Sequence, residues 1–157
     1  MKRDPDMNDP GLSVSVLTVS PFDSDLVILS NVISHSAWTH RSARTLEEAR
    51  TALAVEDVNV VLCEAHLPDG DWKDLLDFTS ELQTPPELIV LSRHADARLW
   101  AKVLNVGAWD VLVPPFLPRD VYRTVHHAFR HWSDTSRLRR KRVQSAEPAV
   151  KISAAGG

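Results

Sequence analysis

The side chains able to do chemistry in this sequence are few and widely spaced. Glu64 ends one apolar run and Ser92 directly follows another, so a carboxyl and a hydroxyl group each stand at the end of a predicted strand. A carboxylate is a ligand for hard divalent cations. His127 and His131, with His126 beside them, have the i, i+4 spacing of a helical metal-binding pair. No cysteine or acidic motif accompanies these histidines, so the sequence predicts no metal site there.

The elements that must position these groups alternate between strand and helix. Apolar or β-branched runs predict five strands, at residues 13–19, 38–42, 59–63, 88–91 and 111–113. Apolar residues at helical spacing predict helices between these runs and a last helix from Pro118 that carries Trp132. Five strands alternating with five helices predict a three-layer, doubly wound α/β fold with a parallel sheet.

Helix boundaries are marked by recognisable start and stop signals. Asp23 and Ser24 are candidates to cap the first helix, which we expect to end near His35. Thr45 and Glu48 have the spacing of a capping box and predict the start of the second helix. The fourth helix is predicted over residues 95–106, with Gly107 at its C-terminal end.

In such a fold, the functional crevice lies at the carboxyl ends of the strands. The residues directly after the predicted strands are therefore the candidate site: Ser20, Pro21, Glu64, Ser92 and Pro114. Cys63, inside an apolar run, is interpreted as a small buried hydrophobic residue.

Length and composition place the chain among ordinary soluble domains. Its 157 residues, 43% hydrophobic and 25% charged, suit one globular domain with a sizeable core. We expect a flexible tail over residues 1–12, a domain over 13–135, and a basic then disordered tail over 136–157. A single cysteine, no signal peptide and no apolar run of about 18 residues predict a soluble cytoplasmic protein without membrane association.

Charge is distributed unevenly along the chain. Residues 1–118 carry 9 Lys and Arg against 18 Asp and Glu, whereas residues 119–157 carry 9 against 3. Much of the positive charge lies in one run, residues 137–142. A basic run without interleaved aromatic residues is more often a solvated helix end than a nucleic-acid site.

Four segments together resemble a known family. Residues 62–71, Leu-Cys-Glu-Ala-His-Leu-Pro-Asp-Gly-Asp, are similar to the phosphoacceptor loop of bacterial response-regulator receiver domains. The runs Val-Leu-Ser at 90–92, Gly-Ala at 107–108 and Pro-Pro-Phe at 114–116 resemble later landmarks of that family. The resemblance covers residues 13–132 and implies the flavodoxin-like topology of chemotaxis-regulator-like receivers.

The same resemblance implies that phosphoryl-transfer chemistry has been lost. The family places an acidic pair for magnesium after the first strand, an acceptor aspartate after the third, a Ser or Thr after the fourth and a lysine after the fifth. Here the corresponding residues are Ser20 and Pro21, Glu64, Ser92 and Pro114. Only Ser92 matches, so we expect no cofactor and no useful magnesium affinity.

Glu64 has three interpretations that the sequence leaves open. Its carboxylate, one methylene longer than aspartate, could mimic a phosphorylated acceptor, or it could be a relict at a partly open strand end. A third interpretation makes it an acceptor, with Asp23 or Asp25 rescuing metal binding. Little would then offset the charge that develops during transfer. We favour capping and helix-dipole roles for Asp23 and Asp25 over a place in the pocket.

The switching and pairing surfaces also depart from the family pattern. The position of the aromatic residue that changes rotamer in the family corresponds here to Val111. Trp100, Trp109 and Trp132 fall in the fourth helix, fifth strand and fifth helix, the surface through which receivers commonly pair. With Val111, they form the candidate interface.

These observations predict a degenerate receiver, or pseudo-receiver. We expect no enzymatic activity, and expect signalling through homodimerisation or a protein partner that does not depend on phosphorylation. One alternative is a functional phosphoacceptor of a phosphorelay. Another, made less favourable by the overall negative charge, is a nucleic-acid-associated protein that uses the last helix and the basic run.

Overall fold

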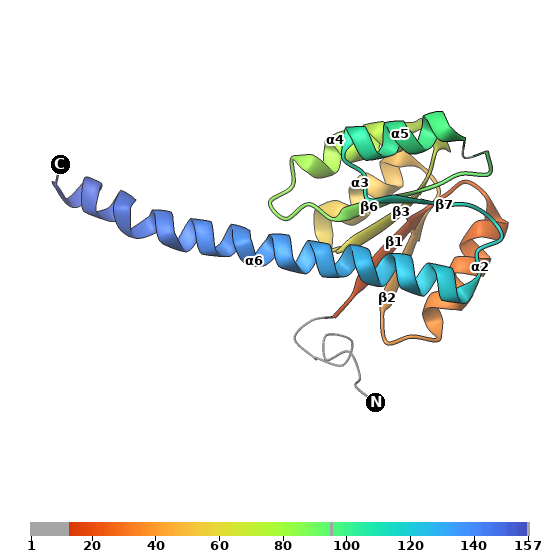
Figure 1. Ribbon diagram of the computed structural model, residues 1–157, viewed down its shortest axis with the longest axis horizontal. Coiled ribbons are helices and arrows are strands. Elements are labelled where there is room, and N and C mark those ends of the chain that lie inside the picture. Colours follow the sequence, from red (N-terminus) through yellow and green to blue (C-terminus); the bar gives the residue numbers. More distant parts are fainter. Residues whose placement is uncertain (1–12, 95, 157) are drawn as a thin grey trace.

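A parallel five-stranded sheet lies between two layers of helices in the computed structural model (Figure 1). The structure describes residues 13–94 and 96–156, with the backbone alone described at residue 140 and from residue 143 onward. The predicted tail over residues 1–12 lies outside the described residues. The predicted three-layer α/β architecture is confirmed.

The sheet has the order β2-β1-β3-β6-β7, so the chain moves outward from β1 in both directions. Its strands are β1 (Ser15–Val19), β2 (Thr39–Ala43), β3 (Val60–Glu64), β6 (Glu87–Leu91) and β7 (Asp110–Leu112). The helices are α2 (Asp23–Ser34), α3 (Leu46–Val55), α4 (Trp72–Ser80), α5 (Ala97–Val106) and α6 (Pro118–Gly156).

Alternate residues along each strand pack into two separate hydrophobic cores, one on each face of the sheet. Leu17, Val61 and Val90 point toward α3, α4 and α5, which contribute residues such as Leu53 and Leu75. Their strand neighbours contact α2 and α6 in a second core that contains Val16, Leu62, Ile89, Leu29, Ile33, Val125 and Phe129. Because β3 is covered on both faces, all five of its residues are buried.

The second core holds β1 and β3 on the side of α2 and α6, which lie together along the lower face of the sheet in Figure 1. β3 pairs in parallel with β1 on one side and β6 on the other, so the carboxyl ends of these three strands meet at one edge of the sheet.

Helix starts agree with the sequence in one case and depart from it in another. Thr45 is the N-cap of α3 and accepts the backbone N–H of Glu48 at 3.1 Å, as predicted. The N-cap of α2 is Phe22, which makes no side-chain capping bond, so the predicted capping by Asp23 or Ser24 is wrong. Both of these residues are already inside the first turn.

The loop after β3 is more ordered than the sequence indicates. It forms a small antiparallel pair, β4 (His66–Leu67) and β5 (Gly70–Asp71). The carboxylate of Asp69 in its turn accepts the N–H groups of Leu46 and Glu47, at 2.8 and 3.0 Å. These bonds tie the loop to the start of α3, where a carboxylate complements the helix dipole.

The last helix extends beyond the predicted domain. α6 runs from Pro118 to Gly156 and projects away from the sheet (Figure 1). We expected disorder beyond Val143, but the backbone there is helical. Alanine, the strongest helix former, occurs four times in residues 144–156, and no glycine occurs between Gly107 and Gly156. Among the described helices, none is long and apolar enough to cross a bilayer.

Candidate functional site

The predicted site residues come together in part at the carboxyl edge of the sheet. Ser20, Glu64 and Ser92 follow or end β1, β3 and β6, and all three are buried. Pro21 is half-buried at the start of the turn into α2. Pro114 follows β7, the outermost strand, and is joined to Pro115 by a cis peptide bond.

Asp25 belongs to this edge, contrary to the role favoured from the sequence. It lies in the first turn of α2 with its side chain buried. The Ser20 hydroxyl donates to its Oδ2 at 3.1 Å, and Arg93 Nη2 donates to its Oδ1 at 2.9 Å. Asp23, by contrast, is exposed and pairs with Arg44. One helical turn therefore directs one carboxylate inward and the other outward.

Arg93 supplies the cation that balances Asp25. It directly follows Ser92, and its guanidinium also stands 4.6 Å from the centre of the Phe22 ring. A guanidinium over an aromatic face and against a carboxylate is held by two attractions at once. With 40% of its side chain exposed, Arg93 bridges the buried carboxylate and solvent.

Glu64 has an unusual proton affinity in this setting. Burial and the nearby charge of Asp25 raise the pKa of its carboxyl, Arg93 partly opposes them, and the net result is a pKa of about 7. Only 7% of the residue is exposed. Near neutral pH, Glu64 therefore exists as a mixture of the charged and the neutral form.

Ser92 keeps its hydroxyl engaged locally. Its Oγ accepts the backbone N–H of His94 at 3.2 Å, and its own N–H donates to the carbonyl of Leu112 at 3.1 Å. Ser92 and Glu64 line one cavity of about 430 Å³. The other side chains that line it come mostly from the loop after β3, from α4 and from α5: Phe22, Ala65, His66, Asp71, Trp72, Lys73, Arg93, His94, Leu99 and Lys102.

The donor set at this edge does not fit a magnesium ion. Magnesium in proteins takes one or two carboxylates in a near-ideal octahedron. Here both oxygens of Asp25 are already bonded, to Ser20 and to Arg93. Glu64 and Asp71 are the carboxyl groups that line the cavity at this edge. The raised pKa of Glu64 makes it a poor ligand near pH 7.

The histidines of α6 are likewise not assembled around an ion. His131 Nδ1 lies 2.6 Å from Glu87 Oε1, and its ring stacks on Trp109 at 4.7 Å between centroids. Within the part of the chain that the structure describes, no three His, Cys, Asp or Glu side chains gather as metal ligands.

The candidate interface residues have different surroundings. Trp100 is 38% exposed on α5, with Leu104 exposed one turn further along. Trp109 is partly buried against the second core, beside His131. Val111 is buried in the first core, so it supports this surface from below rather than forming it.

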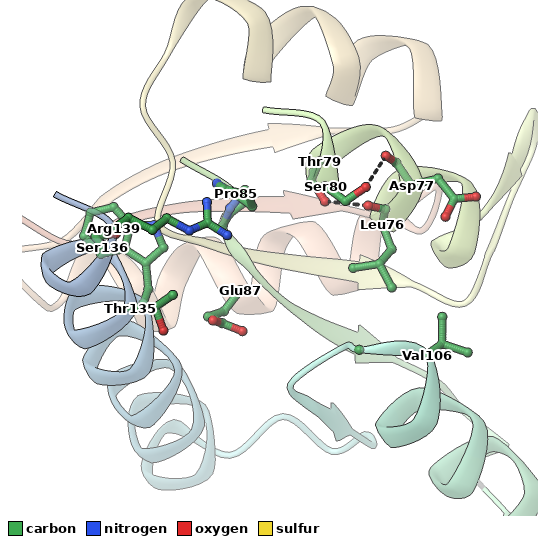
Figure 2. Close-up of a pocket in the computed structure, with 13 residues that line it drawn as sticks. Leu76, Asp77, Thr79, Ser80, Pro85, Glu87, Val106, Thr135, Ser136 and Arg139 are labelled. Atoms are coloured by element: carbon green, nitrogen blue, oxygen red, sulfur yellow. Dashed lines mark hydrogen bonds between the residues drawn. The ribbon is translucent and has the colours of Figure 1, made fainter. Parts of the chain in front are cut away.

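Trp132 faces the opposite edge of the sheet. It stacks on Phe129 and lines a cavity of about 340 Å³ between α4, the start of β6 and α6, shown in Figure 2. Glu87 and Arg139 line the same cavity. Trp132 therefore lies at the amino ends of the strands, away from the Glu64 edge.

The sequence reasoning missed Arg93, Lys73 and Lys102. Arg93 could have been found, because it is the second residue after a strand whose end was already a candidate. Lys73 and Lys102 lie on different helices, and no local pattern indicates that they share a cavity.

Comparisons with known proteins place this geometry in context. No protein-family model matches the sequence. The response regulator protein PilR of Pseudomonas aeruginosa is 38% identical over 77 residues, which are 48% of this chain and 17% of that protein. The DNA-binding transcriptional regulator NtrC of Proteus hauseri is 23% identical over 107 residues, 68% of this chain and 23% of that one. The chain thus matches about a fifth of the length of these curated relatives.

Solved structures share the fold over most of the described chain. The signal receiver domain of an HD domain-containing protein from Pseudomonas fluorescens Pf-5 has a TM-score of 0.73 and 25% identity, over 80% of this chain and 93% of that one. The beryllofluoride-activated NtrC4 receiver domain dimer has a TM-score of 0.70 and 27% identity, over 75% and 98% of the two chains.

Proposed function

Because this chain folds as a CheY-like response-regulator receiver domain of two-component signalling, we propose that it signals by protein association without accepting a phosphoryl group. The observation that carries the proposal is the ion pair between Arg93 and the buried Asp25. It places a permanent cation on a buried carboxylate whose charge acts on Glu64, where an active receiver would need carboxylates free for a metal ion.

The chemistry of transfer would be poorly supported at this edge. Phosphoryl transfer depends on cations that stabilise charge on the equatorial oxygens. Pro114 supplies no ammonium group in the position of the family's lysine. In its protonated form, Glu64 is also a weak nucleophile.

Association is the function that such a scaffold retains. One structural neighbour is described as a receiver domain dimer. On this chain, Trp100 and Leu104 expose apolar surface on α5. The acidic residues 1–118 and the basic residues 119–157 add complementary charge. We propose that a second copy of the chain docks on the surface formed by α5, β7 and α6, in a cytoplasmic setting.

The direct test is intact-mass spectrometry under denaturing conditions after incubation of the full chain with acetyl phosphate and magnesium. We expect no covalent adduct, while a receiver with an acceptor aspartate, treated in parallel, gains one. An adduct on the parent that is absent from Glu64→Ala would contradict the proposal and establish Glu64 as an acceptor.

A magnesium titration provides an independent arm of this test. We expect no saturable binding at or below millimolar concentrations, whether followed by tryptophan fluorescence or by calorimetry. Saturable binding that disappears in both Asp25→Asn and Glu64→Gln would show that the edge assembles a metal site despite Arg93.

A further inference from the structure

The cavity at the amino ends of the strands, on the opposite edge from Glu64, has a wall of mixed character (Figure 2). It lies between the end of α4, the loop before β6, the end of α5 and α6. Its volume of about 340 Å³ is within the range of roughly 300–1,000 Å³ that is common for small-molecule sites. One part of the wall is apolar and consists of Leu76, Pro85 and Val106. This part suits the apolar body of a small ligand.

The face of α6 that points toward the sheet changes from apolar to polar where it reaches this cavity. Val125 and Phe129 are buried in the second core, and the next positions at helical spacing are Trp132, Ser136 and Arg139. Ser136 is only 5% exposed, and its hydroxyl has no hydrogen-bond partner among the described residues. The indole N–H of Trp132 is also buried without a partner in this part of the chain. Because buried polar groups are normally hydrogen-bonded, this end of α6 carries donors that the fold itself does not use.

Charges of both signs line the cavity without pairing with each other. Among the described residues, Arg139 forms no ion pair, and its one hydrogen bond is a long one of 3.4 Å to the carbonyl of Gln83. Glu87 uses Oε1 for His131, and its other carboxylate oxygen has no partner within the described chain. Asp77, exposed near the end of α4, adds a second negative charge. An unpaired guanidinium and a partly free carboxylate therefore share one cavity.

We propose that this cavity binds a free α-amino acid with an apolar side chain. Such a molecule carries a carboxylate and an ammonium group on one carbon atom. The Arg139 guanidinium and the Ser136 hydroxyl donate hydrogen bonds to the carboxylate, and the free oxygen of Glu87 accepts one from the ammonium group. The apolar side chain lies against Leu76 and Val106.

The zwitterion suits this wall better than a simple ion does. Glu87 repels an anion and Arg139 repels a cation, whereas a zwitterion places an opposite charge next to each of them. Binding at this edge goes beyond the association proposed above, and either can hold without the other.

The test is a titration of the uniformly ¹⁵N-labelled full chain with L-leucine, L-methionine and L-phenylalanine, followed by amide and indole chemical shifts. We expect at least one of them to cause saturable shifts at the end of α4, in the loop before β6 and at the Trp132 indole. Arg139→Gln should weaken binding about tenfold, because it removes a charge-assisted hydrogen bond. Arg137→Gln, an equal charge change on the exposed side of α6, should leave binding unchanged, since Arg137 does not line the cavity.

Two analogues of the amino acid that binds most tightly separate its two charged groups. The deamino analogue lacks the ammonium group and the amide lacks the carboxylate, so each should bind about tenfold more weakly. Glu87→Gln should weaken binding of the amino acid and leave that of the deamino analogue unchanged. Absence of saturation below about 10 mM for all three amino acids would overturn the proposal. Equal weakening by Arg139→Gln and Arg137→Gln would also overturn it, as would a deamino analogue that binds as tightly as the amino acid.

Discussion

Arg93, which directly follows Ser92, sets the charge balance at the carboxyl ends of the strands. Asp25 would be a buried, unpaired carboxylate without Arg93, and burial of an unpaired charge is costly. The Arg93 guanidinium therefore neutralises the buried Asp25 carboxylate, as a bound cation would. Because Arg93 remains partly exposed, the interaction is weaker than that of a fully enclosed ion pair.

Arg93→Ala should lower the free energy of unfolding at neutral pH by about 1–3 kcal/mol, less than for a fully buried pair. In an Asp25→Asn background, the same substitution should cost under about 1 kcal/mol, because the charge that Arg93 compensates is gone. Urea unfolding of the four proteins of this double-mutant cycle is the measurement. Equal costs in both backgrounds would show that Arg93 stabilises the fold through Phe22 packing alone.

Glu64 makes stability depend on pH in a direction opposite to that of most carboxyl groups. Its pKa is raised from about 4.5 in the unfolded chain to about 7 in the fold. Between these values the unfolded state has lost the proton that the native state keeps, so stability falls as pH rises through this window. The contribution is present in full below pH 4.5 and is lost above pH 7, and amounts to up to about 3 kcal/mol.

Glu64→Gln should remove this dependence. The variant should resemble the parent near pH 5 and be more stable than it near pH 8, by about 1–3 kcal/mol, because glutamine carries no charge to bury. Unfolding midpoints of both proteins between pH 5 and 8 test this. Parallel pH profiles would mean that Glu64 ionises as freely in the fold as in the unfolded chain.

At the scale of elements, α5 is the least anchored of the helices that cover the sheet. Of its ten residues only Val103 is buried, with Leu99 packed partly against the core. Both of its ends are capped. Asp96 Oδ1 accepts the backbone N–H of Leu99 at 2.9 Å at the start, and Gly107 ends the helix with a φ of 112°. α5 is therefore a well-capped helix held on the sheet by few apolar contacts.

Amide hydrogen exchange should accordingly be faster along the hydrogen-bonded part of α5 than along α3, which buries Leu46, Ala49 and Leu53 in its ten residues. Mass spectrometry of peptic peptides at neutral pH gives the comparison. If the full chain self-associates through α5, protection there should rise with protein concentration, while α3 stays constant. Slower exchange in α5 than in α3 at low concentration would contradict this assignment of local stability.

The elements show why some features were predictable and others were not. The buried strands, the Thr45 cap and the Gly107 stop follow from local periodicity and backbone preference, and the structure confirms them. Asp25 was misassigned because a carboxylate in the first turn of a helix has the same sequence signal whether it faces solvent or Arg93. Its partner is 68 residues away in the chain, and only the tertiary fold brings the two together.

At the scale of the whole molecule, the separation of charge along the chain is the main long-range feature. The acidic residues 1–118 form all the strands, while the basic residues 119–157 belong largely to α6, which projects from the sheet. We expect such a charge distribution to favour an encounter with a second copy in which α6 of one lies against the acidic body of the other. Long-range attraction of this kind guides docking, whereas apolar contacts at the centre provide most of the affinity.

Sedimentation over a wide concentration range tests this arrangement with the parent, Trp100→Ala and Trp132→Ala. A specific interface buries about 1,000 Å² or more, and loss of a central aromatic anchor typically costs about 2 kcal/mol, roughly a thirtyfold weaker association. We expect that loss for Trp100→Ala, since Trp100 is exposed on α5. Trp132→Ala should instead lower stability, because Trp132 packs on Phe129. Val55→Ala, which trims an exposed residue at the far end of α3, is the control and should change neither property.

Salt separates the electrostatic from the apolar contribution to this association. Raising ionic strength from about 0.15 to 1 M shortens the screening length from about 8 to 3 Å, so attraction between α6 and the acidic body should weaken. The parent and Trp100→Ala should lose affinity by a similar factor, because the tryptophan carries no charge. A parent that stays monomeric at every concentration and low salt would rule out the homodimer and leave a different protein as the partner of α5. Association that is unchanged in Trp100→Ala and unaffected by salt would place the interface outside both α5 and α6.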